Sequence, residues 1–466
     1  MDLQIRTISE QELVPFIIAA STASGEASSD AEIERERRMA EPERNMAAFD
    51  GPGIVGTSSV FTMPMSCPGG EIDVGFLTSV GVLPTHRRRG INTELMRRQL
   101  DDAHDRGELV SVLYASEGGI YGRYGYGLGT LGLVIEIETA RSAFVRGYAP
   151  SGSMRLVDRQ EAVKPILAIN GSTRLDRPGM IQLDERRLDY VVSHEHGEEK
   201  ERPTFFALHE DDGGVDGFVT YKITQDWPQG YSRSTLDVRD LQATSAPAHA
   251  DLWRFVLDVD LIERVEAWSR PLDEPLLHLV REPRRLHARM IDNLWVRLVD
   301  LEGALRARRY ATDGRLVVRI ADAFCPWNEG RFELEVSEGN ATVARNPGAK
   351  ADLACTVNEI GAVYLGGTTF RQLRRAGRVE ELADGSLARA DAMFGWDPAP
   401  WSPYDFRSPV TRRSPGRSAT RRARPSRSQA RRRRSGGIGR SPDGLRRPGA
   451  PSPSPSGRRR SGARSP

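Results

Sequence analysis

Residues 84–93 read PTHRRRGINT, and this stretch joins an apolar segment to a helix-like one. The segment before it, TSVGVL (78–83), is rich in strand-forming residues, and the segment after it is ELMRRQLDDAH (94–104). A helix N-terminus has unpaired backbone N–H groups and a partial positive charge. A glycine there lets the backbone approach a bound group, and flanking arginines donate charge-assisted hydrogen bonds. The stretch therefore fits either a pyrophosphate site or a basic surface turn.

The flanking sequence predicts an α/β unit around this junction. SSVFTMPM (58–65) and FLTSVGVL (76–83) are typical of strands, as is LVSVLYAS (109–116) on the other side. Between them, Met96, Leu100 and Ala103 have helical spacing, and Gly107 is placed to end that helix. Strand, helix and strand with short connections indicate a parallel α/β arrangement.

The composition separates an acidic body from a basic tail. The 466 residues suffice for two or three domains. Residues 407–466 contain 19 arginines, one acid and no lysine, which gives a net charge of +18, whereas residues 1–406 have a net charge of −16. An acidic body attracts cationic amines and repels nucleic acid. Nucleic-acid binding is therefore expected only as an unspecific property of the tail.

Other features exclude several protein classes. Cys67, Cys325 and Cys355 lie far apart without a Cys/His cluster, so neither a disulfide framework nor a metal site is predicted. The N-terminus lacks the basic region of a signal peptide, and the apolar run VPFIIAA (14–20) is too short to cross a bilayer. We expect a soluble protein without membrane contacts in the cytoplasm, with secretion left open.

The middle of the chain repeats the first pattern without its basic junction. The Gly/Pro/Ser-rich stretch RGYAPSGS (146–153) marks a boundary. DGFVTYKIT (216–224) and STLDVRDLQAT (234–244) then precede a helix that contains Leu252 and Val256. The junction TSAPAHAD (244–251) has no arginine and no glycine. If this region is a second copy of the same fold, it has lost the function of the RRRG stretch.

The last third of the chain predicts a small α+β region followed by a tail. RLVVRIAD (315–322) and RFELEVS (331–337) flank CPWNEG (325–330), which is a hairpin signal. VNEIGAVYLGG (357–367) is helix-like. Residues 407–466 have no hydrophobic period, so no core can form there and disorder is expected.

A second motif, SEGGIYGRYGYGLGT (116–130), follows the strand after the basic junction and its helix. Together with VGVLPTHRRRGINTELMRRQL (80–100), it strongly resembles the enhanced-intracellular-survival (Eis) N-acetyltransferases, a branch of the GCN5-related N-acetyltransferases (GNAT). Asn92 departs from the Gly or Ala that usually ends the GNAT loop. The resemblance covers residues 1–406. It implies an α/β fold with two tandem GNAT-like domains, the second degenerate, and a sterol-carrier-like α+β domain.

The resemblance also implies domain boundaries and an assembly. We expect a GNAT domain over 1–150, a degenerate copy over 151–288, a sterol-carrier-like domain over 289–406 and the tail over 407–466. The family uses acetyl-CoA without a metal, acetylates cationic amines such as aminoglycosides or protein lysines, and assembles as a homohexamer.

The motifs imply specific site residues by position. Val80, Gly81 and Val82 would offer backbone groups to the pantetheine arm of acetyl-CoA. The pyrophosphate would lie against the junction, that is Arg87, Arg88, Arg89, Gly90, Ile91, Asn92 and Thr93. Ser116 and Glu117 would line the same site. Tyr121 matches the family's general acid, since a phenol can donate a proton to a leaving thiolate, whereas Tyr124 and Tyr126 are interpreted as packing residues.

The general base in this family is the carboxylate of the last residue, and here the tail changes its identity. The family-like ending is WSPYDF (401–406), so Phe406 supplies the carboxylate if the chain ends there. In the full chain the terminal carboxylate belongs to Pro466, which a long disordered tether would position poorly. Three interpretations of the tail are open: it is removed after Phe406, the carboxylate of Pro466 reaches back to the site, or residues 407–466 result from a sequence or reading-frame error. We favour the last, because the composition changes abruptly at residue 407.

Three functions remain open on the sequence alone. The leading hypothesis is an acetyl-CoA-dependent N-acetyltransferase that transfers acetyl directly to a cationic amine in a ternary complex. The second is a non-catalytic carrier that uses the sterol-carrier-like domain. The third is a nucleic-acid binder driven by the tail, which the acidic body opposes. The natural amine and the acyl-chain preference cannot be deduced from these residues.

Overall fold

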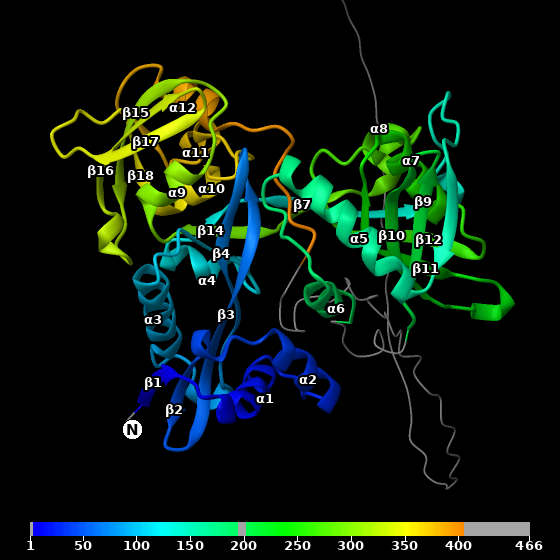
Figure 1. Ribbon diagram of the computed structural model, residues 1–466, viewed down its shortest axis with the longest axis horizontal. Helices are drawn as coiled ribbons and strands as arrows, with labels where there is room; N and C mark the ends of the chain where they lie inside the picture. The colour runs from blue at the N-terminus through cyan, green and yellow to red at the C-terminus, as the bar shows by residue number, and fades with distance from the viewer. Residues whose placement is uncertain (1–2, 194–201, 405–466) are drawn as a thin grey trace, which may run out of the picture. The chain divides into compact units, whose positions relative to one another are not determined.

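The computed structural model describes residues 3–193 and 202–404, which belong to one compact unit built on three β-sheets. Figure 1 shows the two large sheets, coloured blue to cyan and cyan to green, and the smaller sheet, coloured yellow-green. The predicted tail at 407–466 lies outside the described residues. The fold is mixed α/β, as the sequence predicted.

The first sheet has seven strands and carries the basic junction. Its order is β1-β2-β3-β4-β5-β14-β6. The strands span Leu3–Thr7 (β1), Met46–Asp50 (β2), Gly53–Cys67 (β3), Gly70–Val82 (β4), Val110–Tyr114 (β5), Leu294–Leu298 (β14) and Gly127–Leu128 (β6). Four α-helices accompany it, α1 (Leu13–Ala23), α2 (Asp30–Met39), α3 (Ile91–Asp105) and the single turn α4 (Gly118–Tyr121). The strands and helix predicted around residues 84–93 are thus β3, β4, β5 and α3.

The second sheet repeats this order. It runs β13-β7-β12-β11-β10-β9-β8, so that β8 to β12 occupy the places of β1 to β5. The strands span Ser153–Val157 (β8), Phe205–Asp211 (β9), Gly214–Thr224 (β10), Ser234–Ala243 (β11), Ile262–Arg270 (β12), Leu131–Glu138 (β7) and Arg289–Asp292 (β13). Its helices are α5 (Arg159–Thr173), α6 (Glu185–Ser193), α7 (Ala246–Leu257) and α8 (Leu276–Leu279).

The two large sheets exchange a strand. β7 follows the first set of strands along the chain, yet it pairs with β12 and β13 in the second sheet. β14 follows the second set, yet it pairs with β5 and β6 in the first sheet. The domain boundaries were expected at residues 150 and 288. The second sheet nevertheless contains β7, which precedes the first boundary, and the first sheet contains β14, which follows the second boundary.

The third sheet is the small α+β region. Its order is β17-β16-β15-β18-β19, and β15 and β16 form the hairpin predicted around CPWNEG, with Ile320 opposite Gly330. The strands span Gly314–Ala321 (β15), Gly330–Ser337 (β16), Asn340–Arg345 (β17), Leu353–Thr356 (β18) and Glu380–Glu381 (β19). The helices are α9 (Leu301–Ala307), α10 (Val357–Val363), α11 (Phe370–Arg375) and α12 (Ser386–Phe394).

The described chain ends in a segment, residues 400–404, that we name the C-terminal strap. Trp401 donates its indole N–H to the carbonyl of Ser269 at 2.6 Å. The carbonyl of Ser402 accepts from the hydroxyl of Tyr114 at 2.9 Å. The hydroxyl of Tyr404 donates to Oδ2 of Asp240 at 2.8 Å. The strap is thereby bound to both large sheets, and its Tyr114 contact lies at the end of β5.

Candidate active site

Strand β4 leaves its neighbour β5 after a short pairing, and this opens the first sheet. The two strands pair only from Val74 to Phe76 within the described residues. On the other edge of β4, the register with β3 shifts between Thr57 and Ser59, and Ser79 adopts a positive φ of 52°. The C-terminal part of β4 therefore diverges from β5. Its residues Val80 to Val82 line a cavity of about 720 Å³.

The N-terminus of α3 lies at the far end of this cavity. Gly90 is the N-cap residue with φ 81°, and no side chain caps the helix there. A Cβ at Gly90 would meet no atom within 4 Å, so the space above the turn is open. The backbone N–H groups of the first turn have no partner inside the helix. An open glycine turn with free helix amides suits a pyrophosphate, and the residues present thus fit the phosphate portion of acetyl-CoA.

The three arginines of the junction have different positions. Arg88 is exposed, has a positive φ of 62° and lines the cavity. Arg87 also lines it, but its guanidinium donates to the carbonyl of Ala23 at 3.0 Å and thereby joins the end of α1 to β4. Arg89 does not belong to the cavity lining, and it donates to the carbonyl of Thr85 at 3.0 Å. Of the three, Arg88 is the best placed to bind an anion.

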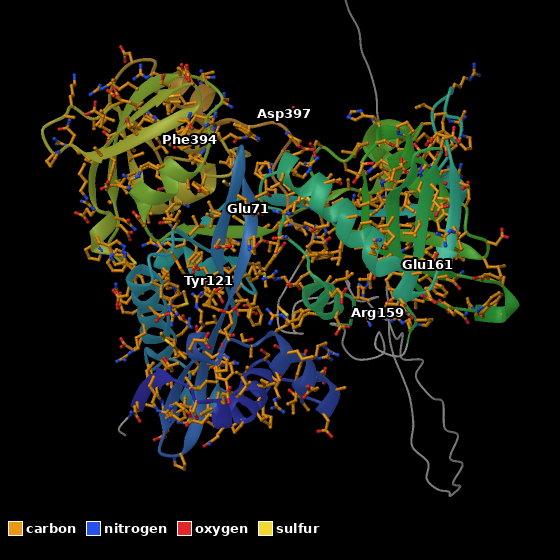
Figure 2. All side chains as sticks on the ribbon, viewed as in Figure 1. Glu71, Tyr121, Arg159, Glu161, Phe394 and Asp397 are labelled. Carbon is orange, nitrogen blue, oxygen red and sulfur yellow. The ribbon has the colours of Figure 1, made fainter. Side chains whose placement is uncertain are left out.

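Tyr121 closes the opposite side of the same cavity. It is the last residue of α4, its side chain is buried, and Figure 2 labels it at that position. Burial raises the pKa of Tyr121 to about 12, the neighbouring Tyr124 adds to the rise, and a hydrogen bond with Ser116 opposes it. The phenol therefore keeps its proton at neutral pH, which is the state that a proton donor requires.

Tyr126 packs behind Tyr121, as the sequence predicted, whereas Tyr124, also interpreted as a packing residue, lines the cavity as well. Both are buried, and the ring of Tyr126 contacts that of Tyr121 edge to face at 6.0 Å between centroids. The hydroxyl of Tyr126 lies 2.8 Å from Oγ of Ser111. Tyr124 has an additional contact, because its hydroxyl accepts from Nδ2 of Asn92 at 3.2 Å. Asn92, the departure from the usual GNAT loop, thus connects the start of α3 to the tyrosine motif.

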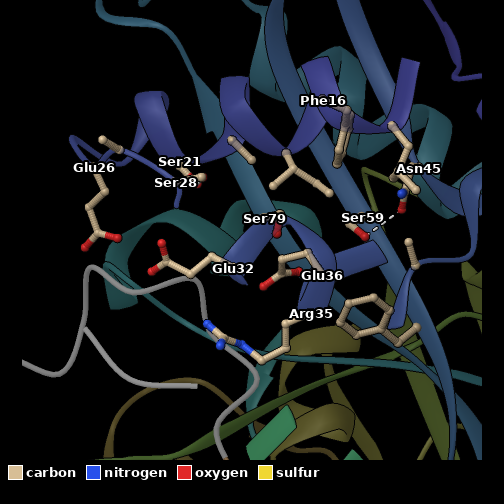
Figure 3. Close-up of a pocket in the computed structure, with 16 residues that line it drawn as sticks. Phe16, Ser21, Glu26, Ser28, Glu32, Arg35, Glu36, Asn45, Ser59 and Ser79 are labelled. Atoms are coloured by element: carbon tan, nitrogen blue, oxygen red, sulfur yellow. Dashed lines mark hydrogen bonds between the residues drawn. The ribbon is translucent and has the colours of Figure 1, made fainter. Parts of the chain in front are cut away.

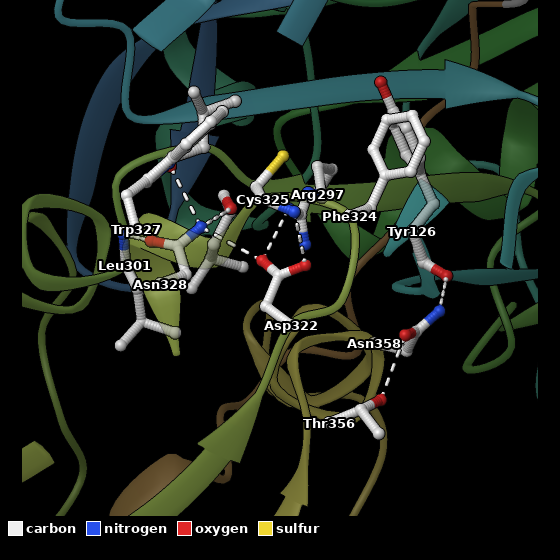
Figure 4. Close-up of polar contacts among 12 residues, drawn as sticks. Tyr126, Arg297, Leu301, Asp322, Phe324, Cys325, Trp327, Asn328, Thr356 and Asn358 are labelled. Carbon is white, nitrogen blue, oxygen red and sulfur yellow. Dashed lines mark hydrogen bonds and ion pairs between the residues drawn. The ribbon is translucent and has the colours of Figure 1, made fainter. Parts of the chain in front are cut away.

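The third sheet supports the tyrosine motif from behind. The side-chain amide of Asn358 donates to the carbonyls of Gly122 and Tyr126, at 2.7 and 2.8 Å (Figure 4). A Cβ at Gly127 would lie 1.9 Å from the carbonyl oxygen of Asn358. Helix α10 therefore packs directly on the motif's backbone, and glycine is required at this contact.

A buried ion pair adds to this support. Arg297 on β14 bonds Asp322 at 2.6 Å, and both side chains are buried (Figure 4). The same guanidinium lies so close to Gly125 that a Cβ there would be 2.1 Å from its Nη1. Breaking a buried pair of this kind is strongly destabilising. The turn after Tyr121 is thus positioned by residues almost 200 positions later in the chain.

A second cavity lies on the other side of β4. It is a narrow space of about 30 Å³ between α1, α2, β3 and β4 (Figure 3). Ser79 lines this cavity, whereas the next residue, Val80, lines the cavity beside α3. Consecutive residues of β4 thus line the two cavities, whose linings share no residue. Three acids, Glu26, Glu32 and Glu36, line the second cavity together with Arg35.

Glu36 is an acid of that cavity with a strongly altered pKa. Burial raises its pKa to about 7, against a hydrogen bond that lowers it. The donor of that bond is the hydroxyl of Tyr190 on α6, at 2.9 Å from Oε1. The second GNAT-like region thus contributes directly to the acidic cavity of the first.

The structure brings almost all predicted site residues to one cavity. Those in its lining are Val80, Gly81, Val82, Arg87, Arg88, Gly90, Ile91, Asn92, Thr93, Ser116, Glu117 and Tyr121. Arg89 lies beside it, and Phe406 and Pro466 lie outside the described residues. The sequence reasoning missed other lining residues, namely Ala23, Ser24, His86, Ile120 and Arg123. Arg123 stands within the quoted tyrosine motif, which could have identified it, whereas the end of α1 carries no motif.

Family comparisons agree with this geometry. A family described as an acetyltransferase (GNAT) domain matches residues 4–129, a second GNAT domain family matches 179–298, and a sterol carrier protein domain matches 301–403. An uncharacterized N-acetyltransferase of Streptomyces avermitilis is 39% identical over 391 residues, which cover 82% of this chain and 94% of that protein. The N-acetyltransferase Eis of Mycobacterium tuberculosis is 31% identical over 373 residues, covering 76% and 87%. The chain belongs to the Eis family of N-acetyltransferases.

A solved Eis-family structure extends this likeness to three dimensions. The crystal structure of Eis1 from Mycobacterium abscessus superposes with a TM-score of 0.74 at 31% identity, and it covers 87% of this chain and all of that one. The chain therefore has the two GNAT domains and the sterol-carrier-like domain of the Eis family. GNAT domains imply acetyl-CoA as the acetyl donor.

Metal-binding groups and membrane-spanning helices are both absent from the described residues. No group of three or more His, Cys, Asp or Glu side chains in residues 3–193 and 202–404 is arranged to hold a metal ion. Within the same ranges, the helices fall short of the length and apolar content that a membrane crossing requires.

Proposed function

We propose that this Eis-family enzyme transfers acetyl from acetyl-CoA directly to an amino group of a cationic acceptor, such as an aminoglycoside or a lysine side chain. The observation that carries the proposal is the pair of cavities lined by consecutive residues at the β4 bulge, one with an open helix N-terminus and the other with three acids. Each cavity suits one of the two reactants by charge.

The donor would bind along β4. The free edge at Val80–Val82 offers backbone groups to the pantetheine amides, and Arg88 with the first turn of α3 would hold the pyrophosphate. Acetyl-CoA supplies an activated acetyl thioester. Its reactive end would then lie between Tyr121 and the bulge at Ser79, where the acidic cavity begins.

Tyr121 would act on the leaving group. As the acceptor nitrogen forms its bond to the acetyl carbon and the carbon–sulfur bond breaks, the sulfur gains a negative charge. The buried Tyr121 hydroxyl holds its proton at neutral pH and would donate it to that sulfur. The phenol is reprotonated from solvent after the products leave.

The acceptor would enter from the acidic cavity. Glu26, Glu32 and Glu36 would attract its ammonium groups, and the amine that reacts must lose a proton to a base. We propose the carboxylate of Phe406 as that base where the chain ends there, and the carboxylate of Pro466 in a full-length chain. A homohexamer, which the family resemblance implies, and a cytoplasmic location are part of the same proposal.

The decisive experiment compares residues 1–406 with the full 466-residue chain. CoA release is measured with acetyl-CoA and kanamycin, and mass spectrometry identifies acetylated kanamycin. Activity confined to the shorter chain would support the Phe406 carboxylate as base. It would also contradict the Pro466 carboxylate as base in the full chain. Equal activity in both chains would contradict a base that only the Phe406 carboxylate can supply. Acetylation of neither kanamycin nor a panel of lysine peptides and polyamines would contradict the enzyme proposal.

The carrier alternative receives less support from the third sheet. The apolar side chains of this region pack against one another in one core, among them Leu316, Phe332 and Phe394. A cavity of about 660 Å³ on this sheet is lined by Arg319, Arg331 and Arg345 beside apolar residues such as Ile320, and the three guanidinium groups suit an apolar tail poorly. Binding of a fluorescent fatty acid that competes with a sterol would be required to revive this alternative.

A further inference from the structure

Another cavity lies where helices of the two GNAT domains meet, and we name it the arginine groove. It has a volume of about 660 Å³ and is lined by α2 of the first domain and by α5 and α6 of the second. This volume is within the range of small-molecule sites. The groove shares no residue with the donor cavity beside α3. It shares one residue, Arg35, with the acidic cavity proposed for the acceptor, which we name the acceptor cavity (Figure 3).

Four arginines from three helices line this groove. Arg35 and Arg38 belong to α2, Arg186 belongs to α6, and Arg159 begins α5, where Figure 2 labels it. The two carboxylate oxygens of Asp189 bind different partners, Arg38 at 3.3 Å and Arg159. Arg186 donates to the backbone carbonyl of Arg38 at 3.2 Å. These contacts hold the arginine side chains together across the helices, so that their positive charges face one space.

The acids of the lining do not balance these four cations. They are Asp189, which two of the arginines share, and Glu185, so the lining has a formal net charge of +2. Nε of Arg35 is buried and has no hydrogen-bond partner among the described residues. The next residue, Glu36, lies in the acceptor cavity. Like charges that face one cavity repel each other, and a buried donor without an acceptor is costly. The groove therefore favours an anion with several acceptor oxygens.

The chemistry of the lining indicates the class of that anion. Guanidinium groups bind phosphate oxygens through paired, charge-assisted hydrogen bonds. A phosphate monoester has a charge of about −2 at neutral pH, which matches the lining, whereas a single carboxylate supplies half of that charge. Met39, Val163 and Tyr190 also line the groove and offer contact to an organic group. The groove thus suits a phosphate that is attached to a small organic molecule.

We propose that the arginine groove binds the phosphate monoester of a small organic molecule, with its phosphate between the four guanidinium groups and its organic group against Met39 and Val163. This site is separate from the acetylation reaction and does not rest on the proposed function. Its walls come from both GNAT domains, so a bound ligand connects α2 to α5 and α6. Tyr190 belongs to the groove and also donates to Glu36, which links the site to the acceptor cavity.

The test uses phenyl phosphate and phenyl sulfate, which have nearly the same shape and differ by one charge at about pH 8. Binding to the full 466-residue chain is measured by equilibrium dialysis without acetyl-CoA. A salt concentration of about 0.2 M weakens contacts with exposed arginines, including those of residues 407–466. Because the donor cavity also suits phosphates, the parent protein carries Arg88→Gln. We expect this parent to bind phenyl phosphate at least fivefold more tightly than phenyl sulfate.

Three further substitutions in that parent locate the bound phosphate. Arg38→Gln and Arg186→Gln each remove a charged donor from the groove and should weaken phenyl phosphate binding about tenfold. Arg37→Gln is the matched control, because it removes the same charge from the same helix. Arg37 pairs with Glu34 at 3.7 Å and does not line the groove, so its replacement should change the affinity by less than about twofold. Melting temperatures establish that each variant is folded.

Three outcomes would overturn the proposal. The first is equal affinity of the parent for the two probes. The second is phenyl phosphate binding that neither Arg38→Gln nor Arg186→Gln weakens, which would assign the binding to the donor cavity or to the arginines of residues 407–466. The third is equal weakening by Arg37→Gln and Arg38→Gln, which would reduce the groove to general surface charge. If Arg186→Gln does not fold, the comparison of Arg38→Gln with Arg37→Gln still decides.

Discussion

The two GNAT domains have the same strand order, yet they differ at the start of one helix. In the first domain α3 begins at Gly90, and no side chain caps it. In the second domain α7 begins after Ser245, whose hydroxyl accepts from the N–H of Ala248 at 3.2 Å. A capped terminus has fewer free amides for a phosphate. A single side chain thus removes much of what the first domain offers to acetyl-CoA.

The strand that precedes each of these helices also differs between the domains, and again only the first domain leaves the donor side open. The end of β4 borders the open donor cavity. At the end of β11, the carbonyl of Leu241 accepts from Arg270, which also pairs with the buried Glu274. Glu274 in turn accepts from His249 on the first turn of α7, at 2.7 Å. The second domain has therefore filled its donor side with a buried polar network.

The largest effect is expected where the third domain supports the first. Gly127→Ala would place a methyl group against the backbone of Asn358, and the tyrosine motif would have to move. We expect a loss of about 3 kcal/mol in the free energy of unfolding and near-complete loss of acetylation. Gly119→Ala is the matched control, since its Cβ would meet nothing within 4 Å. Urea unfolding and CoA release measure both, and a fully active Gly127→Ala enzyme would contradict the role of α10.

Tyr121→Phe tests the chemistry that only the first domain retains. Removing the phenolic proton should lower kcat by about 100-fold, the usual scale for a general acid. The KM for acetyl-CoA should stay within about twofold, because the buried ring and its packing on Tyr126 are kept. Steady-state kinetics with kanamycin measure both constants. An unchanged kcat would show that Tyr121 is not the proton donor.

The open helix terminus predicts unequal effects of neighbouring arginines. Arg88→Ala should raise the KM for acetyl-CoA about tenfold, since a charged hydrogen bond contributes about 1.5 kcal/mol or more. Arg89→Ala should raise it by less than about threefold, because Arg89 bonds Thr85 outside the cavity lining. Kinetics at varied acetyl-CoA and fixed acceptor give both values. Equal effects of the two substitutions would mean that the summed charge of the three arginines, and not the position of Arg88 in the cavity, determines acetyl-CoA binding.

The raised pKa of Glu36 predicts a smaller effect, a pH dependence of stability and of the KM for kanamycin. Its pKa is raised from 4.5 to about 7, so the folded chain binds a proton there more tightly than the unfolded chain does. The resulting stability is complete below about pH 4.5 and is lost as the pH rises through 7. The carboxylate that forms attracts the acceptor, so the KM for kanamycin should fall a few-fold from pH 6 to pH 8. Glu36→Gln should reduce this pH dependence, and identical profiles would contradict the role of Glu36.

The sequence predicted the elements around the basic junction because they carry local signals. Strands β3, β4 and β5 are rich in strand formers, and the helical spacing of Met96, Leu100 and Ala103 identified α3. Those signals, with the tyrosine motif, were enough to identify most of the donor cavity. The sequence also indicated that the second copy has lost the function of the basic junction, because TSAPAHAD (244–251) has no arginine and no glycine.

The remaining features depend on contacts between distant residues. Nothing local indicates that β14 inserts beside β5, or that Asn358 holds the turn after Tyr121. The acceptor cavity needs a hydroxyl from α6, and the divergent stretch before β2 carries no motif. Such pairings are set by tertiary packing, which overrides local propensity.

The exchange of β7 and β14 has a consequence for how this enzyme is made and inherited. The first sheet lacks its sixth strand until the ribosome has synthesised residue 298, so the acetyl-CoA site cannot be completed on a short nascent chain. A gene fragment that encodes the first domain alone would specify a sheet with an unfilled gap. We therefore expect the three domains to be transmitted through evolution as a single inherited block.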